Sequence, residues 1–357
     1  MNDNTCGQRT EKERLEWLAT AQKYPLELKE VLSLQRIRQA MRHFDGKMYV
    51  AYSGGLDSTV LLHLIRREYP DVVAVFADTG QEFESIYSQV RATDNVTWLE
   101  PRMSFDEIVK KYGIPMISKK LCRMIQDVKN PTARNAKTVN LRLTGMTQKG
   151  EYQPRWKIPN KWMKLLDAPF RVTNKCCGIL KIDPTKPYQK RTGEVPFVGV
   201  MAEESENRRS SYARGGGCNA FNQSRGASSR PIMFWTEQDI LQYVIKYQIP
   251  YADIYGEIVL KDGLLAKTGE QRTGCKYCLF GAHMKKGENQ FQALARIEPE
   301  SYKKAIEEYG YAEALDYCGI PWRPVNLGVM GCVECADTET KILISPHKCG
   351  CNQMESK

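Results

Sequence analysis

The stretch that most constrains this chain is residues 48–59, which read MYVAYSGGLDST. Its apolar residues predict a buried strand, its two glycines predict a tight turn, and the Asp, Ser and Thr that follow favour the start of a helix. A strand, a glycine turn and a helix N-terminus in this order can cradle phosphate, because backbone N–H groups and the helix dipole face the anion. No Gly-Lys-Ser/Thr follows at Walker spacing. We expect nucleotide phosphates to lie over Ser53, Gly54, Gly55, Asp57 and Ser58.

Strands and helices alternate on either side of this loop. Residues 72–77 and 97–100 predict two further strands, a helix is expected near 104–112, and residues 195–200 predict another strand. Such alternation predicts an α/β fold with a doubly wound parallel sheet. Asp78 and Thr79 directly follow a strand, so we expect them at the edge where open parallel sheets bind ligands.

The composition predicts several units in the 357 residues. N-terminal helices, divided in two at Pro25, are expected over residues 1–45, and a nucleotide-binding α/β domain over 46–250, with a basic insertion at about 119–170. A helical, cysteine-rich extension follows, with a Cys-x-x-Cys region over 251–330 and a tail over 331–357.

The cellular compartment is predicted from the lack of a membrane-spanning segment and of a signal peptide in the sequence. No apolar run approaches the roughly 20 residues that span a bilayer, and the polar start MNDNTCG has no signal-peptide segment. We therefore expect a cytoplasmic protein without a membrane partner. Because the cytosol keeps thiols reduced, the 12 cysteines favour metal or cluster ligation over disulfides.

Basic residues are concentrated in residues 119–191, which hold 18 Lys and Arg against 4 Asp and Glu, while the whole chain has a net charge of +10. This local excess, with interleaved aromatic residues, favours a polyanionic partner, either nucleic acid or a highly charged nucleotide; a solvated basic insertion is the alternative. Cys122 lies in the sequence KKLCR. Neighbouring cations lower a thiol pKa, so Cys122 is a candidate catalytic acceptor of persulfide sulfur, although a buried helix cysteine would look the same.

Two cysteine motifs lie about a hundred residues apart. Cys176 and Cys177 are adjacent, and Cys275 and Cys278 form a Cys-x-x-Cys. Together they supply four thiolates, enough for an iron–sulfur cluster or a tetrahedral zinc ion.

The combination of these motifs resembles the phosphoadenosine phosphosulfate (PAPS) reductase family, within the adenine nucleotide α-hydrolase-like fold and the ATP pyrophosphatase (PP-loop) superfamily. The matching elements are SGGLDS at 53–58, FADTG at 76–80, Cys-Cys-x-x-x-Lys at 176–181, Gly199 followed by Glu204-Ser-x-x-Arg208, PIMFW at 231–235 and the Cys-x-x-Cys. The resemblance implies a [4Fe–4S] cluster on Cys176, Cys177, Cys275 and Cys278. It also implies that Glu204 and Arg208 help to bind the nucleotide.

Two departures from the family pattern bear on the reaction. The reductases carry a degenerate phosphate loop, whereas this loop is complete, and their arginine two residues after the glycine is Met201 here. These departures favour ATP, with Mg²⁺ near Asp57, cleaved to AMP and pyrophosphate while a substrate is adenylated for sulfur transfer. The substrate would be nucleic acid, tRNA or DNA, bound by residues 119–191, and a cysteine desulfurase would be a suitable sulfur donor. The alternatives are thioredoxin-dependent reduction of an adenylyl sulfate to sulfite, and a non-catalytic nucleotide-binding partner protein.

The tail carries its own cysteine pattern. Cys332 and Cys335 are followed by Cys349 and Cys351, with a potential hairpin around residues 341–344. This spacing resembles a small zinc ribbon. A sulfur-relaying tail is the alternative, because the reductases place a nucleophilic cysteine near their C-terminus.

Overall fold

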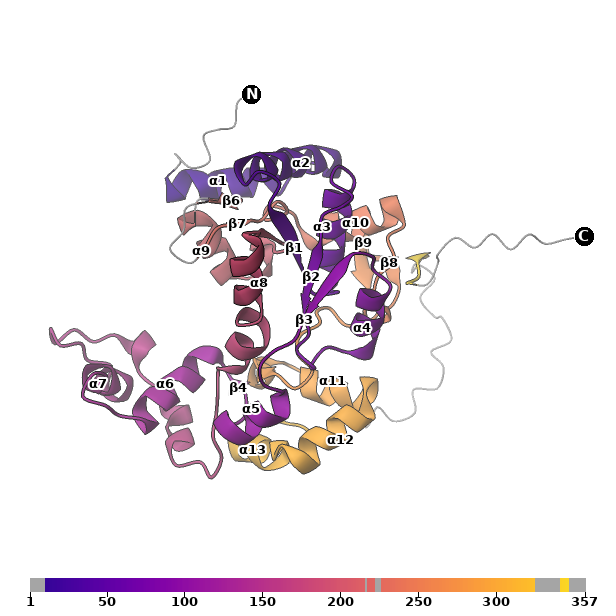
Figure 1. Ribbon diagram of the computed structural model, residues 1–357. Helices are drawn as coiled ribbons and strands as arrows, with labels where there is room; N and C mark the ends of the chain where they lie inside the picture. Colours follow the sequence, from indigo (N-terminus) through magenta and orange to yellow (C-terminus); the bar gives the residue numbers. More distant parts are fainter. Residues whose placement is uncertain (1–9, 216, 222–225, 325–340, 347–357) are drawn as a thin grey trace, which may run out of the picture.

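The computed structural model describes residues 10–215, 217–221, 226–324 and 341–346. The chain begins with two helices, α1 (Glu11–Ala21) and α2 (Leu26–His43), which cross the top of the molecule in Figure 1. They are separated at Pro25, as predicted, and a capping box between Thr10 and Glu13 starts the first of them.

The central sheet has six strands in the order β3-β2-β1-β5-β7-β6 within the described residues. All neighbours are parallel except β6 and β7. The strands are β1 (Met48–Tyr52), β2 (Ala74–Ala77), β3 (Val96–Leu99), β5 (Val195–Val198), β6 (Asn219–Ala220) and β7 (Ser228–Ser229). Since β2 and β5 flank β1 on opposite sides, the strand order reverses at β1, and ligands bind at such a switch point in open α/β sheets.

Helices cover both faces of the sheet, which confirms the doubly wound α/β prediction. Alternate residues of β1 separate the two faces: Val50 belongs to the main core, whereas Tyr49 packs with Val75 and Tyr188 on the other side. The main face carries α3 (Leu56–Arg66), α4 (Glu84–Arg91) and α10 (Glu237–Tyr247), and the opposite face carries α8 (Thr185–Thr192).

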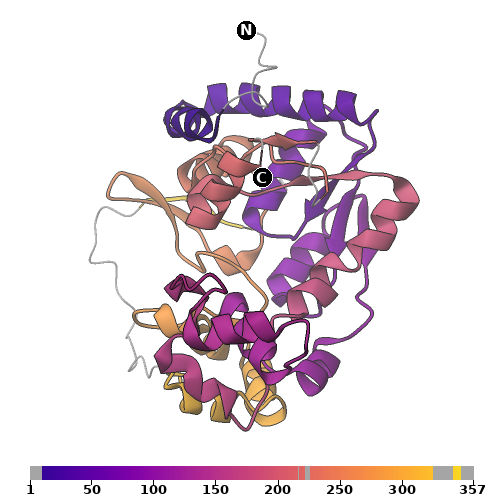
Figure 2. The same ribbon diagram turned by 90° about the vertical axis from the view of Figure 1, so that its left-hand side faces the viewer.

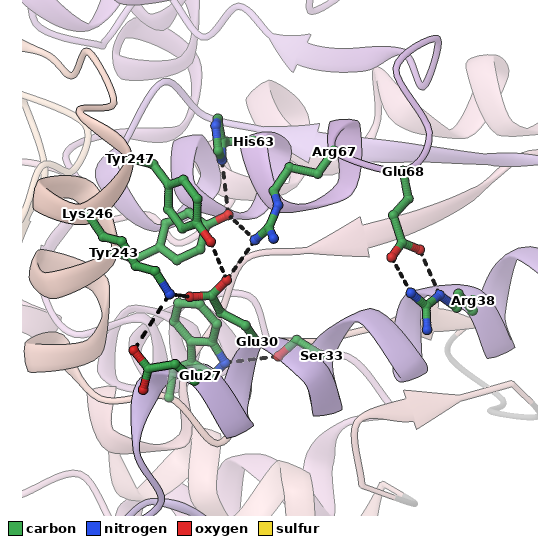
Figure 3. Close-up of polar contacts among 11 residues, drawn as sticks. Glu27, Glu30, Ser33, Arg38, His63, Arg67, Glu68, Tyr243, Lys246 and Tyr247 are labelled. Carbon is green, nitrogen blue, oxygen red and sulfur yellow. Dashed lines mark hydrogen bonds and ion pairs between the residues drawn. The ribbon is translucent and has the colours of Figure 1, made fainter.

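A polar network fixes α2 against α3 and α10, as Figure 3 shows. The Glu30 carboxylate accepts hydrogen bonds from Arg67 (2.7 Å), Lys246 (2.6 Å) and Tyr247 (2.7 Å). Burial would raise the pKa of Glu30, but these donors outweigh it and lower the pKa. The N-terminal helices therefore belong to the same packed unit as the sheet.

A second lobe lies below the sheet in Figure 1 and contains both the predicted insertion and the C-terminal helices. Its elements are α5 (Phe105–Tyr112), β4 (Met116–Ile117), α6 (Lys119–Lys129), α7 (Ala136–Thr144), β10 (Leu279–Phe280), α11 (Gln290–Ile297), α12 (Pro299–Glu308) and α13 (Tyr311–Cys318). The insertion is therefore largely helical and is packed against elements far away in the sequence.

Three separate chain segments meet in this lobe through backbone hydrogen bonds, and we call them the three-segment ribbon. They are residues 114–117, 171–173 and 279–281. β4 pairs in parallel with β10, the N–H of Ile114 donates to the carbonyl of Arg171 (2.8 Å), and the N–H of Thr173 donates to the carbonyl of Ile114 (2.9 Å). The ribbon brings the chain near Cys176 and the chain near Cys278 to the same place.

The remaining described elements border the sheet. They are α9 (Glu206–Arg214), β8 (Ile258–Lys261), β9 (Leu264–Lys267) and β11 (Lys341–Ile344). β11 pairs antiparallel with β8, so residues 341–344 form a strand on the β8–β9 hairpin. Among the described residues, no helix combines the length and apolar character needed to cross a bilayer.

Candidate active site

The loop after β1 is held in a closed turn by its own hydroxyl groups. Ser58 Oγ donates to the carbonyl of Gly55 (2.8 Å) and lies 3.1 Å from Ser53 Oγ, and the N–H of Gly55 donates to Ser53 Oγ (3.3 Å). Leu56 begins helix α3, so the loop meets the N-terminus of a buried helix, as predicted. We call residues 53–58 the PP-loop.

Glycine is required at the first turn position of the PP-loop. Gly54 has φ of +70°, and an added Cβ would lie 2.7 Å from Val90 and 2.8 Å from Ile86 on α4. An added Cβ at Gly199, which follows β5, would lie 3.1 Å from the backbone of Asp57. The turn therefore fits tightly between α4 and the end of β5, which fixes the direction of its N–H groups.

Asp57 lies on the first turn of α3, near both acidic and basic side chains. Burial and the nearby carboxylate of Glu204 raise the pKa of Asp57 to about 6, although Lys267 and Arg272 oppose the shift. Glu204 is in turn held by the N–H of Met201 (2.7 Å) and lies 3.6 Å from Arg272. Two carboxylates near one phosphate loop repel each other when both are ionised. A divalent cation or another positively charged group bound between them would relieve this repulsion.

Most of the other residues that were predicted to contact the nucleotide lie near this loop. In the structure they form hydrogen bonds or ion pairs with neighbouring protein groups. Asp78 accepts hydrogen bonds from Tyr87 (2.7 Å) and from the N–H of Gly80 (3.0 Å), and the buried Thr79 donates to Glu82 (3.1 Å). Arg208 is exposed, and its Nε lies 3.9 Å from Glu204. Their roles toward a nucleotide remain predictions.

The four cysteines of the two distant motifs line one small cavity. Its other walls come from Gln81, Phe105, Pro115, Leu180 and Lys181. The three-segment ribbon explains the convergence, because its strands end beside Cys176 and begin after Cys278. A π-helical turn at Gly178–Ile182 follows Cys177 and carries Lys181 on its final part.

Charge around the thiols is uneven. A hydrogen bond from Cys176, together with Lys119 and Lys181, lowers the pKa of Cys177, whereas burial raises the pKa of Cys275 to about 12. Lys181 donates to Glu82 (3.1 Å) and also hydrogen-bonds Cys275. Although burial would lower the pKa of Lys181, Glu82 and Cys275 raise it, so this ammonium remains charged at the cysteine cavity.

The donor set fits an iron–sulfur cluster. Four thiols in one cavity, which is otherwise mainly apolar apart from Gln81 and Lys181, are the ligands such clusters take. The thiols enclose only about 20 Å³, so a cluster would have to displace their side chains outward. In the described part of the chain, no three Cys, His, Asp or Glu side chains are arranged to hold a single metal ion. A cluster on Cys176, Cys177, Cys275 and Cys278 stays a prediction.

The expectation for Cys122 is not met. Its side chain is 1% exposed, and its thiol donates to the carbonyl of Met116 (3.0 Å). Burial raises the pKa of Cys122 to about 12, so the cations beside it in sequence do not create a thiolate. A catalytic persulfide role for Cys122 is therefore corrected to a core position on α6.

Three residues near the site were not predicted. The Tyr255 hydroxyl accepts from the N–H of Leu56 (3.2 Å) and lies 2.8 Å from Thr273 Oγ1, so it ties the PP-loop to the segment before Cys275. Lys181 and Arg272 are the other two. Of the three, only Lys181 was indicated by the sequence, as the lysine of the Cys-Cys-x-x-x-Lys motif at 176–181.

The cysteines of the predicted zinc ribbon, Cys332, Cys335, Cys349 and Cys351, lie outside the described residues. Zinc at that site stays a prediction.

Comparison with known proteins decides the family. A family model described as the phosphoadenosine phosphosulfate reductase domain matches residues 47–278, which is more than half of the chain. The chain belongs to this family. It is thus phosphoadenylyl-sulfate reductase-like, and the family is one of nucleotide-binding enzymes.

The family includes relatives of two named activities. The chain is 22% identical over 224 residues to a phosphoadenosine 5′-phosphosulfate reductase of Alkalilimnicola ehrlichii, covering 62% of this chain and 71% of the relative. It is 23% identical over 230 residues to an adenosine 5′-phosphosulfate reductase of Bacillus cereus, covering 62% and 74%. A crystal structure of the PAPS reductase from Candida auris in a phosphate complex aligns with a TM-score of 0.34 and 16% identity, over 69% of this chain and 83% of that one.

Proposed function

We propose that this chain binds an adenylyl sulfate at the PP-loop and reduces its sulfate group to sulfite. The observation that carries the proposal is the convergence of four thiols and a charged lysine, Lys181, whose partner Glu82 follows strand β2 of the nucleotide sheet. The names of the relatives support it, since reductases of both adenosine 5′-phosphosulfate and its 3′-phosphorylated form occur among them.

The reaction requires two electrons and a thiol. A thiolate would attack the sulfur, the S–O bond would break, and AMP or its 3′-phosphate would leave while sulfur stays as a thiosulfonate. A dithiol of the thioredoxin class would then release sulfite and become a disulfide. Cys349 and Cys351 were predicted first as zinc ligands, and this reaction requires the alternative in which one of them is the attacking thiol.

The chain's own groups would hold the nucleotide. The N–H groups of the PP-loop and the N-terminus of α3 would bind its phosphate, and Arg272 would neutralise charge beside Glu204. Lys181 would attract the sulfate group. An iron–sulfur cluster bound by the four cysteines would supply a charged, redox-active centre beside the sulfur.

A second candidate is favoured by the complete PP-loop and by Met201. The Met201 side chain is 4% exposed and carries no charge, so it cannot replace the arginine that holds a sulfate in the reductases. In this candidate, ATP with Mg²⁺ near Asp57 is cleaved to AMP and pyrophosphate, a substrate is adenylated, and sulfur from a cysteine desulfurase-type donor displaces AMP. Nucleic acid is the acceptor that the basic segment suits.

One assay separates the candidates. Anaerobically purified protein is incubated with adenosine 5′-phosphosulfate, its 3′-phosphorylated form or ATP, with thioredoxin and thioredoxin reductase present, and sulfite and pyrophosphate are both measured. Sulfite from a sulfonucleotide is expected. Pyrophosphate from ATP without any sulfite would overturn the first proposal in favour of the second.

The cluster is tested by colour. The anaerobic protein should absorb near 400 nm, and Cys275→Ser should lose this absorbance. Cys318→Ala removes a buried thiol outside the quartet and should keep it. A colourless wild-type protein with no bound iron would refute the cluster assignment.

A further inference from the structure

A basic cleft separates the second lobe from the segments beside the PP-loop. It encloses about 1090 Å³ and is lined by the start of α6, by residues 154–162, by residues 280–284, and by Glu204, Ser205 and Arg272 from the other side. The insertion that forms one wall faces the viewer in Figure 2. The nucleotide binding proposed above uses Glu204 and Arg272 on one wall, but it gives no role to Lys120, Arg155 and Lys157 on the other.

The charges of the cleft are strongly unbalanced. Lys119, Lys120, Arg155 and Lys157 line one wall, and Arg272 lines the other, against the single carboxylate of Glu204 among the lining residues. Beside the cleft, the ring of Trp156 lies near Lys120 (4.9 Å), Arg155 (5.6 Å) and Arg142 (5.2 Å), and Arg142 is paired with Asp127 (3.2 Å). Cations that share one wall repel one another, and a bound anion would relieve this repulsion.

The N-terminus of α6 also favours an anion. The first turn of this helix contains Lys119 and Lys120 and no acidic residue, and Ser118 caps it. Cations at a helix N-terminus are unfavourable, because the positive end of the helix dipole repels them. A phosphate bound there would interact favourably with the dipole and with both lysines. Ile117, directly before the cap, holds φ of +64°, an unusual backbone conformation for a β-branched residue.

The cleft also offers surfaces that suit bases. Met284 lines the cleft and is 76% exposed, and the partly exposed His283 packs edge-on at 5.4 Å against Trp162, which is itself only 7% exposed. His283 Nδ1 is buried and has no hydrogen-bond partner among the described residues. Burial and Lys161 lower the pKa of His283, so the ring is neutral and can exchange a hydrogen bond with a base edge.

We propose that this cleft binds a single-stranded nucleic acid segment of a few nucleotides. Pockets for one small ligand enclose about 300–1,000 Å³, so the cleft exceeds what one nucleotide needs. Cations that follow a phosphate backbone together with exposed apolar and ring surfaces are the usual combination for single strands. A duplex presents its bases inside the helix and would leave Met284 and His283 unused. The inference deepens the second candidate above and rests on its nucleic-acid acceptor, but binding is measured without turnover, so a failure to bind is distinguished from a failure to cleave ATP.

The test uses the full-length protein and a fluorescein-labelled 12-nucleotide dT or rU strand, with anisotropy measured between 50 and 200 mM salt and no other nucleotide present. If five cations contact phosphates, affinity should fall about 100-fold over this range, since each contact contributes roughly 0.7 to the salt slope for single strands. The triple variant Lys120→Ala/Arg155→Ala/Lys157→Ala should bind more weakly and lose about 2 from the slope.

The matched control removes three exposed lysines of the same segment that do not line the cleft, Lys137→Ala/Lys149→Ala/Lys190→Ala. It should retain nearly the full affinity and slope. Circular dichroism of both variants checks folding, and a single Lys157→Glu substitution, which leaves the Lys120 contact to Arg155 intact, should also weaken binding.

Several outcomes would overturn the proposal. Equal losses in the two triple variants would show that only net charge matters. Tighter binding of a 12-base-pair duplex than of the single strand would exclude single-strand recognition. Absence of binding at 50 mM salt would leave an acidic protein as the partner that the cleft fits.

Discussion

The raised pKa of Asp57 has a measurable consequence for stability. Its carboxyl changes from an ordinary value of 3.8 to about 6 in the folded chain, because burial and the charge of Glu204 disfavour the anion. Between these two values the native state holds a proton that the unfolded state has released. Stability therefore falls as pH rises from about 4 to 6, and the loss is complete above this window.

Asp57→Asn removes the titrating group while keeping size and shape. At about 1.4 kcal/mol per pKa unit, the shift corresponds to about 3 kcal/mol at pH 7.5 and about half of that at pH 5. The variant should exceed the wild-type protein in unfolding free energy by these amounts, which urea titration followed by tryptophan fluorescence measures. Because Asp57 is the predicted carboxylate for Mg²⁺, ATP with Mg²⁺ should raise the urea midpoint of the wild-type protein more than that of the variant.

Asp262→Asn is the matched control. Asp262 is exposed in the turn between β8 and β9 with φ of +51°, a conformation that Asn adopts equally well. Its stability difference from the wild-type protein should be small. If Asp57→Asn is less stable than the wild-type protein, or if its advantage is the same at pH 5 and pH 7.5, the electrostatic reasoning is wrong.

Three further substitutions test other contacts. Gly54→Ala should abolish nucleotide binding and cost about 1–3 kcal/mol, since its Cβ would lie 2.7 Å from Val90; calorimetry with and without nucleotide measures both, and unchanged binding would contradict the tight fit. Lys29→Met leaves the buried Asp239 carboxylate without the ammonium that lies 2.5 Å away, and urea unfolding should show a loss of about 3–5 kcal/mol; a loss below 1 would refute a buried charge pair. Lys181→Gln should weaken sulfonucleotide binding at least 10-fold, about 1.4 kcal/mol, in equilibrium titration, and unchanged affinity would remove Lys181 from the site.

The sequence predicted those features that depend on local pattern. The strand, glycine turn and helix around Gly54 appear as expected because apolar runs, φ preference and helix capping act over neighbouring residues. The two N-terminal helices separated at Pro25 follow for the same reason.

Features that depend on distant contacts could not be predicted. The cations beside Cys122 suggested a reactive thiol, but the packing of α6 against β4 buries the sulfur, and burial outweighs the cations. Tyr255 reaches the PP-loop from about 200 residues away, and no sequence spacing indicates that contact. The basic segment was predicted to favour a polyanion, but only the fold brings Arg272 opposite Lys119 across one cleft.

The three-segment ribbon also determines when the cysteine cavity can form during synthesis. Cys176 and Cys177 leave the ribosome about a hundred residues before Cys275, which at roughly 5–20 residues per second amounts to about 5–20 s. During this interval β4 lacks β10, which has not yet been made, and only the pairing of Ile114 with residues 171–173 can form. The first two thiols are therefore exposed to oxidants and stray metal ions before their own pocket exists, and assembly of any cluster must wait until the second half of the chain folds onto the first.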